Sequence, residues 1–252
     1  MRYFFLLMTG FFLWTQAVSA QANDGALIQQ ANIAYASGDY QTAQMLYEQV
    51  IQNGFHDPSV YFNLGNAYYE SGDLGQALLN YRIVQQFWPR DLDLNRNLAL
   101  IWSERVDIQG DETGLAEGIA ALTIGVVTLT ELSLLVAGLW TAFFGLAALV
   151  IFRARWRERL RLFLVGAGMV LLVGLLLLGS RLYVETSHQT GIVVQPVALV
   201  RSGPGDQYLE LYQLHSAAEV HVWDTQNGWV RFALPDGRLG WLPVQALEII
   251  RQ

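Results

Sequence analysis

Apolar and polar positions are arranged along the chain in three ways, and each predicts a different kind of structure. Residues 24–107 contain a repeated helical pattern, residues 132–152 and 162–180 are two uncharged apolar stretches, and short β-branched and aromatic runs follow from residue 191. These patterns are typical of amphipathic helices, membrane-spanning helices and strands, respectively. We therefore predict a multidomain membrane protein with an all-α domain, two transmembrane helices and a small all-β barrel.

The first twenty residues have the pattern of a secretory signal peptide. Arg2 precedes an apolar run over residues 3–14, and polar Thr15 and Gln16 then lead to small residues that end at Ala20. A positive start, an apolar run and a small-residue cleavage site define such a peptide. The alternative is an uncleaved anchor, for which the apolar run is short. We predict a cleaved signal peptide at residues 1–20.

Residues 132–152 and 162–180 are predicted to span a membrane. Neither stretch carries a charge, and each is long enough to cross roughly 30 Å of hydrocarbon. A buried hairpin in a globular domain is the alternative, but neither helix has the polar face that it requires. Thr128 and Glu131 have the spacing of a capping box, so we expect the first helix to begin there. Residues 114–127 are apolar but broken by glycines, and are predicted to be an interfacial segment.

The link between the two spans, residues 153–161, is strongly basic in a chain whose net charge is −7. Its five arginines are Arg153, Arg155, Arg157, Arg159 and Arg161. Burying one arginine at mid-bilayer costs about 2.5–3.5 kcal/mol, so the link is predicted to be a turn outside the hydrocarbon. The positive-inside rule predicts that this turn lies in the cytoplasm. Both domains are then predicted to lie in the periplasm, with the two spans in a bacterial inner membrane. The rest of the chain is acidic, which argues against nucleic acid as a partner.

Residues 37–51 and 71–85 are similar segments that begin 34 residues apart with Ser-Gly-Asp. The recurrence of Ala and Tyr in register predicts a helical repeat. The second copy resembles the tetratricopeptide repeat family at Tyr61, Leu64, Gly65, Tyr68, Ala77, Tyr81, Val84 and Pro89. The resemblance implies paired antiparallel helices over residues 24–107, with residues 91–102 as a capping helix that lacks a partner helix. Because two pairs and a cap are marginal, we expect support from a partner, an oligomer or the membrane.

A row of asparagines is the candidate binding site of the helical domain. Aligning the first helix of each repeat places one groove at Asn32, Asn63, Asn66 and Asn97, with Phe62, Tyr69 and Arg96 nearby. Carboxamides donate and accept hydrogen bonds, so such a row can hold the backbone of an extended peptide. An alternative is that these asparagines are solvated or cap turns. A clamp for a terminal carboxylate is disfavoured, because Ile28 and Asp93 stand where relatives carry lysines.

Residues 190–252 are predicted to form the small barrel, with a tight turn between two strands at residues 235–237. The segment resembles bacterial SH3 domains in "VRSGPG" at residues 200–205 and in two Gly-Trp pairs that contain Trp229 and Trp241. Its departure is "LHSAAEV", where the family usually has a glycine before the strand. We expect Trp229 and Trp241 to pack the barrel interior. The candidates for an exposed ligand surface are Tyr208, Tyr212 and Trp223.

The sequence predicts neither an enzyme nor a metal site nor a cofactor. It contains no cysteine, no nucleophile elbow and no carboxylate pair, and His215 and His221, expected on neighbouring strands, have no acidic cluster beside them. The order of its segments resembles the BatE family of the Bat aerotolerance operon, which is encoded with a MoxR-type ATPase and von Willebrand factor A domain proteins. The resemblance implies a membrane-anchored adaptor for membrane or periplasmic proteins in an envelope complex. A peptidoglycan-binding sensor that uses the barrel is the alternative.

Overall fold

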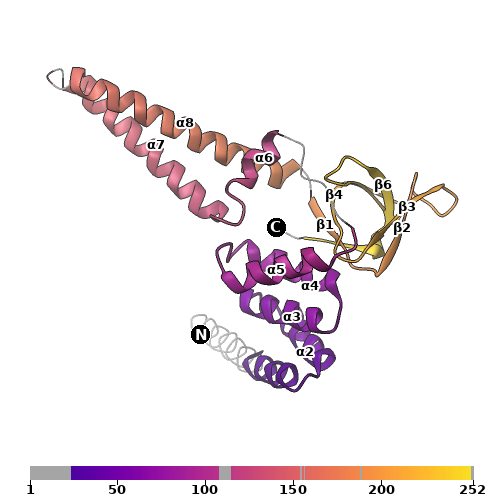
Figure 1. Ribbon diagram of the computed structural model, residues 1–252. Helices are drawn as coiled ribbons and strands as arrows, with labels where there is room; N and C mark the ends of the chain where they lie inside the picture. Colours follow the sequence, from indigo (N-terminus) through magenta and orange to yellow (C-terminus); the bar gives the residue numbers. More distant parts are fainter. Residues whose placement is uncertain (1–23, 108–114, 154, 156, 188, 251–252) are drawn as a thin grey trace, which may run out of the picture.

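The computed structural model describes residues 24–107 and 115–250, except for residues 154, 156 and 188. A helical domain is followed by a hairpin of two long helices and then by a curled sheet (Figure 1). Both domains lie at the same end of the hairpin (Figure 1). The predicted signal peptide at residues 1–20 lies outside the described residues.

The helical domain begins with a helix described over residues 24–36. Four more helices follow, which are α2 (Tyr40–Gln52), α3 (Pro58–Glu70), α4 (Leu74–Gln85) and α5 (Leu92–Glu104). An aspartate caps each of these four by accepting a hydrogen bond from a backbone N–H in the first turn, as is typical of helix starts. Gly38 and Gly72, at equivalent positions of the predicted repeat, both have positive φ, +80° and +85°, a conformation that glycine adopts most readily. The two segments therefore form the same turn.

The core of the helical domain is built from positions that recur after 34 residues. Tyr47 and Tyr81 are both buried, as are the pairs Ala43 and Ala77, and Val50 and Val84. Gly65 permits the close approach of α3 and α4, because a Cβ at this position would lie 2.7 Å from a Tyr81 ring carbon. The repeated pattern thus corresponds to repeated packing.

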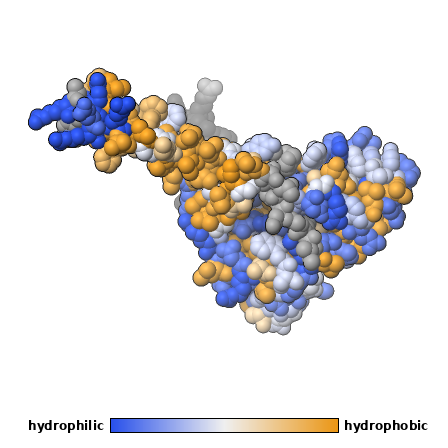
Figure 2. Space-filling model, turned by 45° about the horizontal axis from the view of Figure 1, so that its top comes forward, coloured by the Kyte–Doolittle hydropathy of each residue, from blue (hydrophilic) through white to orange (hydrophobic). Residues whose placement is uncertain are grey.

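The hairpin consists of α7 (Leu129–Phe152) and α8 (Arg157–Ser187), and α6 (Leu115–Ala121) contacts α8. Thr128 and Glu131 form the predicted capping box, so the expected start of the first helix is confirmed. Both helices are long and apolar enough to cross a membrane, and only 6% and 11% of their most apolar windows are buried. Figure 2 shows this hydrophobic shaft ending in a hydrophilic tip. Apolar side chains that face outward over this length are suited to lipid.

The predicted turn at residues 153–161 is too long. α7 ends at Phe152 and α8 begins at Arg157, so Arg157, Arg159 and Arg161 belong to the first turns of α8. The reason is that the stretch contains neither glycine nor proline, and arginine is a good helix former. The second helix also continues past residue 180, and Arg181 lies within it.

The C-terminal domain is an antiparallel sheet with strand order β3-β2-β6-β5-β4-β1-β7. Its strands are β1 (Gln189–Val193), β2 (Val197–Arg201), β3 (Glu210–His215), β4 (Glu219–Gln226), β5 (Trp229–Ala233), β6 (Leu239–Pro243) and β7 (Leu247–Ile249), with a short 3-10 helix, Val244–Ala246, before the last. The predicted turn at residues 235–237 joins β5 to β6, and Gly237 has a φ of +86°. The interior contains Val200, Leu214, Val220, Val230, Phe232 and Leu242.

The prediction that Trp229 and Trp241 pack the interior is wrong. Both are half-buried, and each precedes a residue of the core, Val230 or Leu242. Successive side chains of a strand point to opposite faces, so both rings lie on the outer face. Ring size suggested the interior, whereas the alternation along each strand decides the face.

The expectation that His215 and His221 lie on neighbouring strands is also wrong. His215 is in β3 and His221 is in β4. Although these strands are consecutive in the chain, three other strands separate them in the sheet.

Candidate functional site

The β domain packs directly against the last helices of the helical domain. Ile192, Ala217 and Ile250 of the β domain belong to one buried cluster together with residues of α4 and α5, including Leu78, Tyr81, Leu94, Leu98 and Ile101. The β domain therefore covers the end of the helical stack that the predicted capping helix forms. The end of the stack is thus covered by the chain's own β domain, which was not among the expected sources of support, a partner, an oligomer or the membrane.

Ala217 lies in the turn between β3 and β4, within the segment "LHSAAEV" that departs from the family resemblance. Its φ is +67°, a region that costs a residue with a Cβ about 1–2 kcal/mol. Its side chain is fully buried in the cluster shared with the helical domain. The methyl group that strains this turn is therefore also part of the interface.

Glu219, at the start of β4, forms the polar centre of the interface. Its Oε2 accepts hydrogen bonds from Nε and Nη2 of Arg82 at 3.0 and 2.6 Å. Its Oε1 accepts from Nε1 of Trp102 at 3.4 Å and lies 3.9 Å from Nη1 of Arg105. The Arg82 guanidinium also lies 5.3 Å from the centre of the Trp102 ring. One carboxylate thus joins side chains of α4 and α5, and Arg105 just after α5, to the sheet.

Three further polar contacts surround this centre. The backbone N–H of Gly75, in the first turn of α4, donates to Oγ of Ser216 at 2.8 Å. A Cβ at Gly75 would lie 2.6 Å from the Val193 carbonyl oxygen. Asp107 Oδ2 accepts from the backbone N–H of His215 at 2.6 Å, and Gln76 Nε2 donates to Glu248 Oε1 at 2.7 Å. Sequence reasoning missed this interface, for which a glycine in the first turn of a helix was the available signal.

The predicted asparagine row is built into the packing of the repeats. Asn32 Oδ1 accepts from the Tyr47 hydroxyl at 2.5 Å, and Asn66 Oδ1 accepts from the Tyr81 hydroxyl at 2.7 Å. Both partners of the second bond lie 34 residues after those of the first. Asn97 Nδ2 donates to Asn66 Oδ1 at 2.9 Å. The tyrosines hold the carboxamide oxygens, which fixes the direction of each NH₂ group.

Three of the four asparagines line one cavity of about 350 Å³. Its lining consists of Asn32, Tyr35, Tyr47, Asn63 and Asn66. Burial raises the pKa of Tyr47 to about 12, so its hydroxyl stays protonated and remains a donor at neutral pH. A binding role for this cavity stays a prediction.

The three residues predicted near this groove lie in other settings. Phe62 packs against the core, with its ring 5.9 Å from that of Tyr81. The Tyr69 hydroxyl donates to Glu104 Oε1 at 2.6 Å. Arg96 is exposed and pairs with Asp93 at 3.6 Å.

The candidates for a ligand surface on the β domain separate into two groups. Tyr208 and Trp223 are 42% and 53% exposed, as expected. Tyr212 is not an exposed ligand group, because it packs against the core and its hydroxyl donates to the Leu239 carbonyl at 3.3 Å. The period-two alternation that places Trp229 and Trp241 outside gives the outer face of the sheet three tryptophans. Arg231 lies among them, 5.7 Å from the Trp223 ring and paired across the strands with Trp241.

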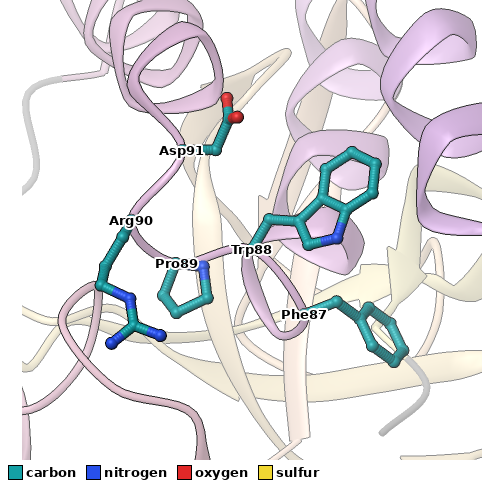
Figure 3. A pocket seen from close by; sticks show the side chains of 5 residues that line it. All are labelled: Phe87, Trp88, Pro89, Arg90 and Asp91. Carbon is teal, nitrogen blue, oxygen red and sulfur yellow. The ribbon is translucent and has the colours of Figure 1, made fainter.

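The connection between α4 and α5 lines an open cavity of about 410 Å³ with Phe87, Trp88, Pro89, Arg90 and Asp91. The rings of Phe87 and Trp88 leave the loop on one side and the Arg90 side chain on the other (Figure 3). Arg90 Nη2 lies 2.6 Å from Glu131 Oε1. Because Glu131 belongs to the capping box of α7, this ion pair joins the helical domain to the start of the hairpin.

Within the described parts of the chain, no three His, Asp or Glu side chains are grouped to hold a metal ion. No protein-family model matches the sequence, and neither does any curated protein.

Proposed function

We propose that the chain is a non-catalytic adaptor in the bacterial inner membrane, whose tetratricopeptide-like and SH3-like domains act as one binding body in the periplasm. The observation that carries this proposal is the docking of the two domains. The hairpin separates them in sequence, yet they share a buried cluster at the end of the hairpin opposite its arginine-rich tip. Two domains with a common core must lie on one side of a membrane, and the positive-inside rule favours the cytoplasm for the tip.

The proposed partners are other membrane or periplasmic proteins, with the von Willebrand factor A domain proteins of a Bat complex as the first candidates. The cavity at Asn32, Asn63 and Asn66 is suited to the backbone of an extended segment, because the NH₂ groups of Asn32 and Asn66, whose oxygens accept from the tyrosines, can donate to peptide carbonyls. The 34-residue period and its repeated turns support the tetratricopeptide interpretation of this domain.

Topology is tested with reporter fusions at Asn66, Trp156 and Trp229. A reporter active only in the cytoplasm is expected to work at Trp156, and one active only in the periplasm at Asn66 and Trp229. The opposite pattern would overturn the topology and the adaptor proposal with it.

Partner binding is tested by crosslinking in native membranes followed by capture of the chain. A discrete protein partner is expected, and it should be lost when Asn63 and Asn66 are both changed to alanine. Arg96→Ala is the matched control, because Arg96 is exposed on α5 and does not line the cavity. Retention of every partner by the asparagine variant would remove the groove from the proposal.

A peptidoglycan sensor is the second candidate, and the tryptophans on the outer face of the sheet favour it. Aromatic faces and a neighbouring arginine suit stacking against sugars and pairing with peptide carboxylates. The test is co-sedimentation of the full chain in detergent with purified cell-wall sacculi, compared with Trp223→Ala. The full chain is required because an isolated β domain would expose Ile192, Ala217 and Ile250. Absence of sedimentation would exclude this candidate.

A further inference from the structure

Apolar side chains are exposed on the α4–α5 connection. Phe87 is 56% exposed, Trp88 is 38% exposed and Leu92, the first residue of α5, is 80% exposed. Single exposed apolar residues are common on soluble proteins, but neighbouring large ones mark an interaction surface. We call these three residues the aromatic loop patch.

The Arg90–Glu131 ion pair, with Nη2 and Oε1 2.6 Å apart, shows that the α4–α5 connection lies beside the start of α7. Glu131 lies in the first turn of α7, and residues 132–152 after it carry no charge. The pair therefore marks the level at which the apolar part of the hairpin begins. The aromatic loop patch lies next to Arg90 in the chain and so is held near this level.

A second apolar segment lies at the same end of the hairpin, before α7. Leu115 and Leu122 are 82% and 70% exposed, and Val126, two residues before the Thr128 cap, is 54% exposed. α6 contacts α8, so this segment stays beside the hairpin. Exposed apolar side chains therefore lie near the start of the apolar part of the hairpin both on the α4–α5 connection and on the segment before α7.

We infer that Phe87, Trp88 and Leu92 insert into the headgroup boundary of the membrane that α7 and α8 cross, and so hold the helical domain against the bilayer. Tryptophan is suited to this region, because its ring is apolar while its N–H needs a polar partner. A lipid surface is the occupant that the position favours, since the ion pair places the patch where the hydrocarbon begins. This inference rests on the proposed membrane hairpin.

The charges around the patch indicate which lipids it needs. Arg90 is paired with Glu131, and Asp91 and Asp93 are close in the chain. The patch therefore offers no unpaired cluster of positive charge to anionic headgroups. Insertion is expected in vesicles of phosphatidylcholine alone, and it should not weaken as the salt concentration rises.

The test uses single cysteine variants of the full chain, which contains no cysteine of its own. Phe87→Cys and Leu92→Cys probe the patch. Met45→Cys is the matched control, because Met45 is 62% exposed and lies on α2, at the end of the helical stack away from the hairpin (Figure 1). Leu176→Cys, in the apolar part of α8, reports on the hairpin itself. Each variant carries a fluorescent label in phosphatidylcholine nanodiscs that hold one copy of the chain.

Nitroxide lipids labelled near the headgroup are expected to quench labels at residues 87 and 92 at least threefold more than the label at residue 45. Aqueous iodide should quench in the reverse order. Equal quenching at residues 87, 92 and 45 would overturn the inference while a quenched Leu176→Cys label keeps the membrane hairpin. A Leu176→Cys label that no lipid quenches would overturn the proposed function as well. Protection of residue 87 from iodide only in discs that hold several copies would assign the patch to a second chain and overturn the inference.

Discussion

Replacement of Glu219 by glutamine should loosen the contact between the two domains. The substitution keeps the size of the side chain and removes the charge that accepts two hydrogen bonds from Arg82. The Arg82 and Glu219 side chains are only 23% and 14% exposed, so water cannot fully replace the lost partner. Arg105 loses the same neutralising charge, because its guanidinium lies 3.9 Å away.

The expected cost is about 2 kcal/mol. Hydrogen bonds to charged groups contribute about 1.5–3 kcal/mol, exposed pairs contribute about 0.2–1 kcal/mol, and loss of one partner from a fully buried pair costs about 3–5 kcal/mol. Because the Arg82–Glu219 pair is mostly but not fully buried, the cost of losing one partner should lie between the values for an exposed pair and a fully buried pair. Because 1.4 kcal/mol is about a factor of ten, the equilibrium for separating the domains should shift about thirtyfold.

Hydrogen exchange of the Gly75 amide is the matching assay. This N–H donates across the interface to Ser216, so it exchanges when the domains separate. In the regime in which exchange follows the opening equilibrium, Glu219→Gln should accelerate it about thirtyfold. The control is Asp93→Asn, which breaks a pair whose side chains are both 74% exposed, and it should change the rate by less than about twofold. Acceleration in Glu219→Gln no larger than in the control would refute the assignment of Glu219 as the centre of the interface.

Three further predictions concern the interface, the repeats and the hairpin. Gly75→Ala should separate the domains, because its Cβ would lie within 3 Å of backbone atoms of residues 193 and 194. We expect faster hydrogen exchange of the backbone amides at the interface, whereas Gly25→Ala, with no atom within 4 Å of the added Cβ, should have no effect. Equal exchange rates in the two variants would contradict the close approach at Gly75. Burial raises the pKa of Tyr47 to about 12 from 10.0, so its contribution to stability is complete below pH 10 and is lost as the pH rises towards 12. The free energy of unfolding, followed by helical circular dichroism, should fall in this window and should fall less steeply in Tyr47→Phe, where Tyr68 and Tyr81, whose pKa values burial also raises, still contribute, whereas an equal slope in the variant would contradict the burial of this hydroxyl. Changing all five arginines at the tip to glutamine should remove the topological bias, so that reporters at Asn66 and Trp229 show mixed orientation; an unchanged orientation would mean that the arginines do not determine it.

The predictions that succeeded rest on local signals. Thr128 and Glu131 identified the start of α7 because a capping box needs only residues three apart. The 34-residue period predicted a helical repeat, and the equivalent turns at Gly38 and Gly72 agree with it, since equal local sequences adopt equal local structures. The turn at residues 235–237 was predicted because Pro-Asp-Gly between two strand patterns is a local turn signal.

The interface between the two domains was not predicted, because it depends on which surfaces meet in three dimensions. Nothing local distinguishes Arg82, which pairs with Glu219, from Arg96, which is exposed. The asparagines were aligned correctly, and Asn32, Asn63 and Asn66 do line one cavity. The hydroxyl partners of Asn32 and Asn66 lie 15 residues away on the second helix of each pair, so their role in packing appears only once the helices are paired.

The shared cluster also determines the order in which the two domains can complete their folding during synthesis. Leu78 and Leu98 are synthesised before the hairpin, while Ile192, Ala217 and Ile250 are synthesised after it. If the proposed topology holds, the apolar surface of α4 and α5 stays uncovered until α7 and α8 have been inserted and the last strands have been exported. A chain that fails at either step keeps this surface open to chaperones and proteases. In the proposed topology, contact between the two domains would therefore indicate that the hairpin has been inserted, and incomplete molecules would expose the apolar surface of α4 and α5.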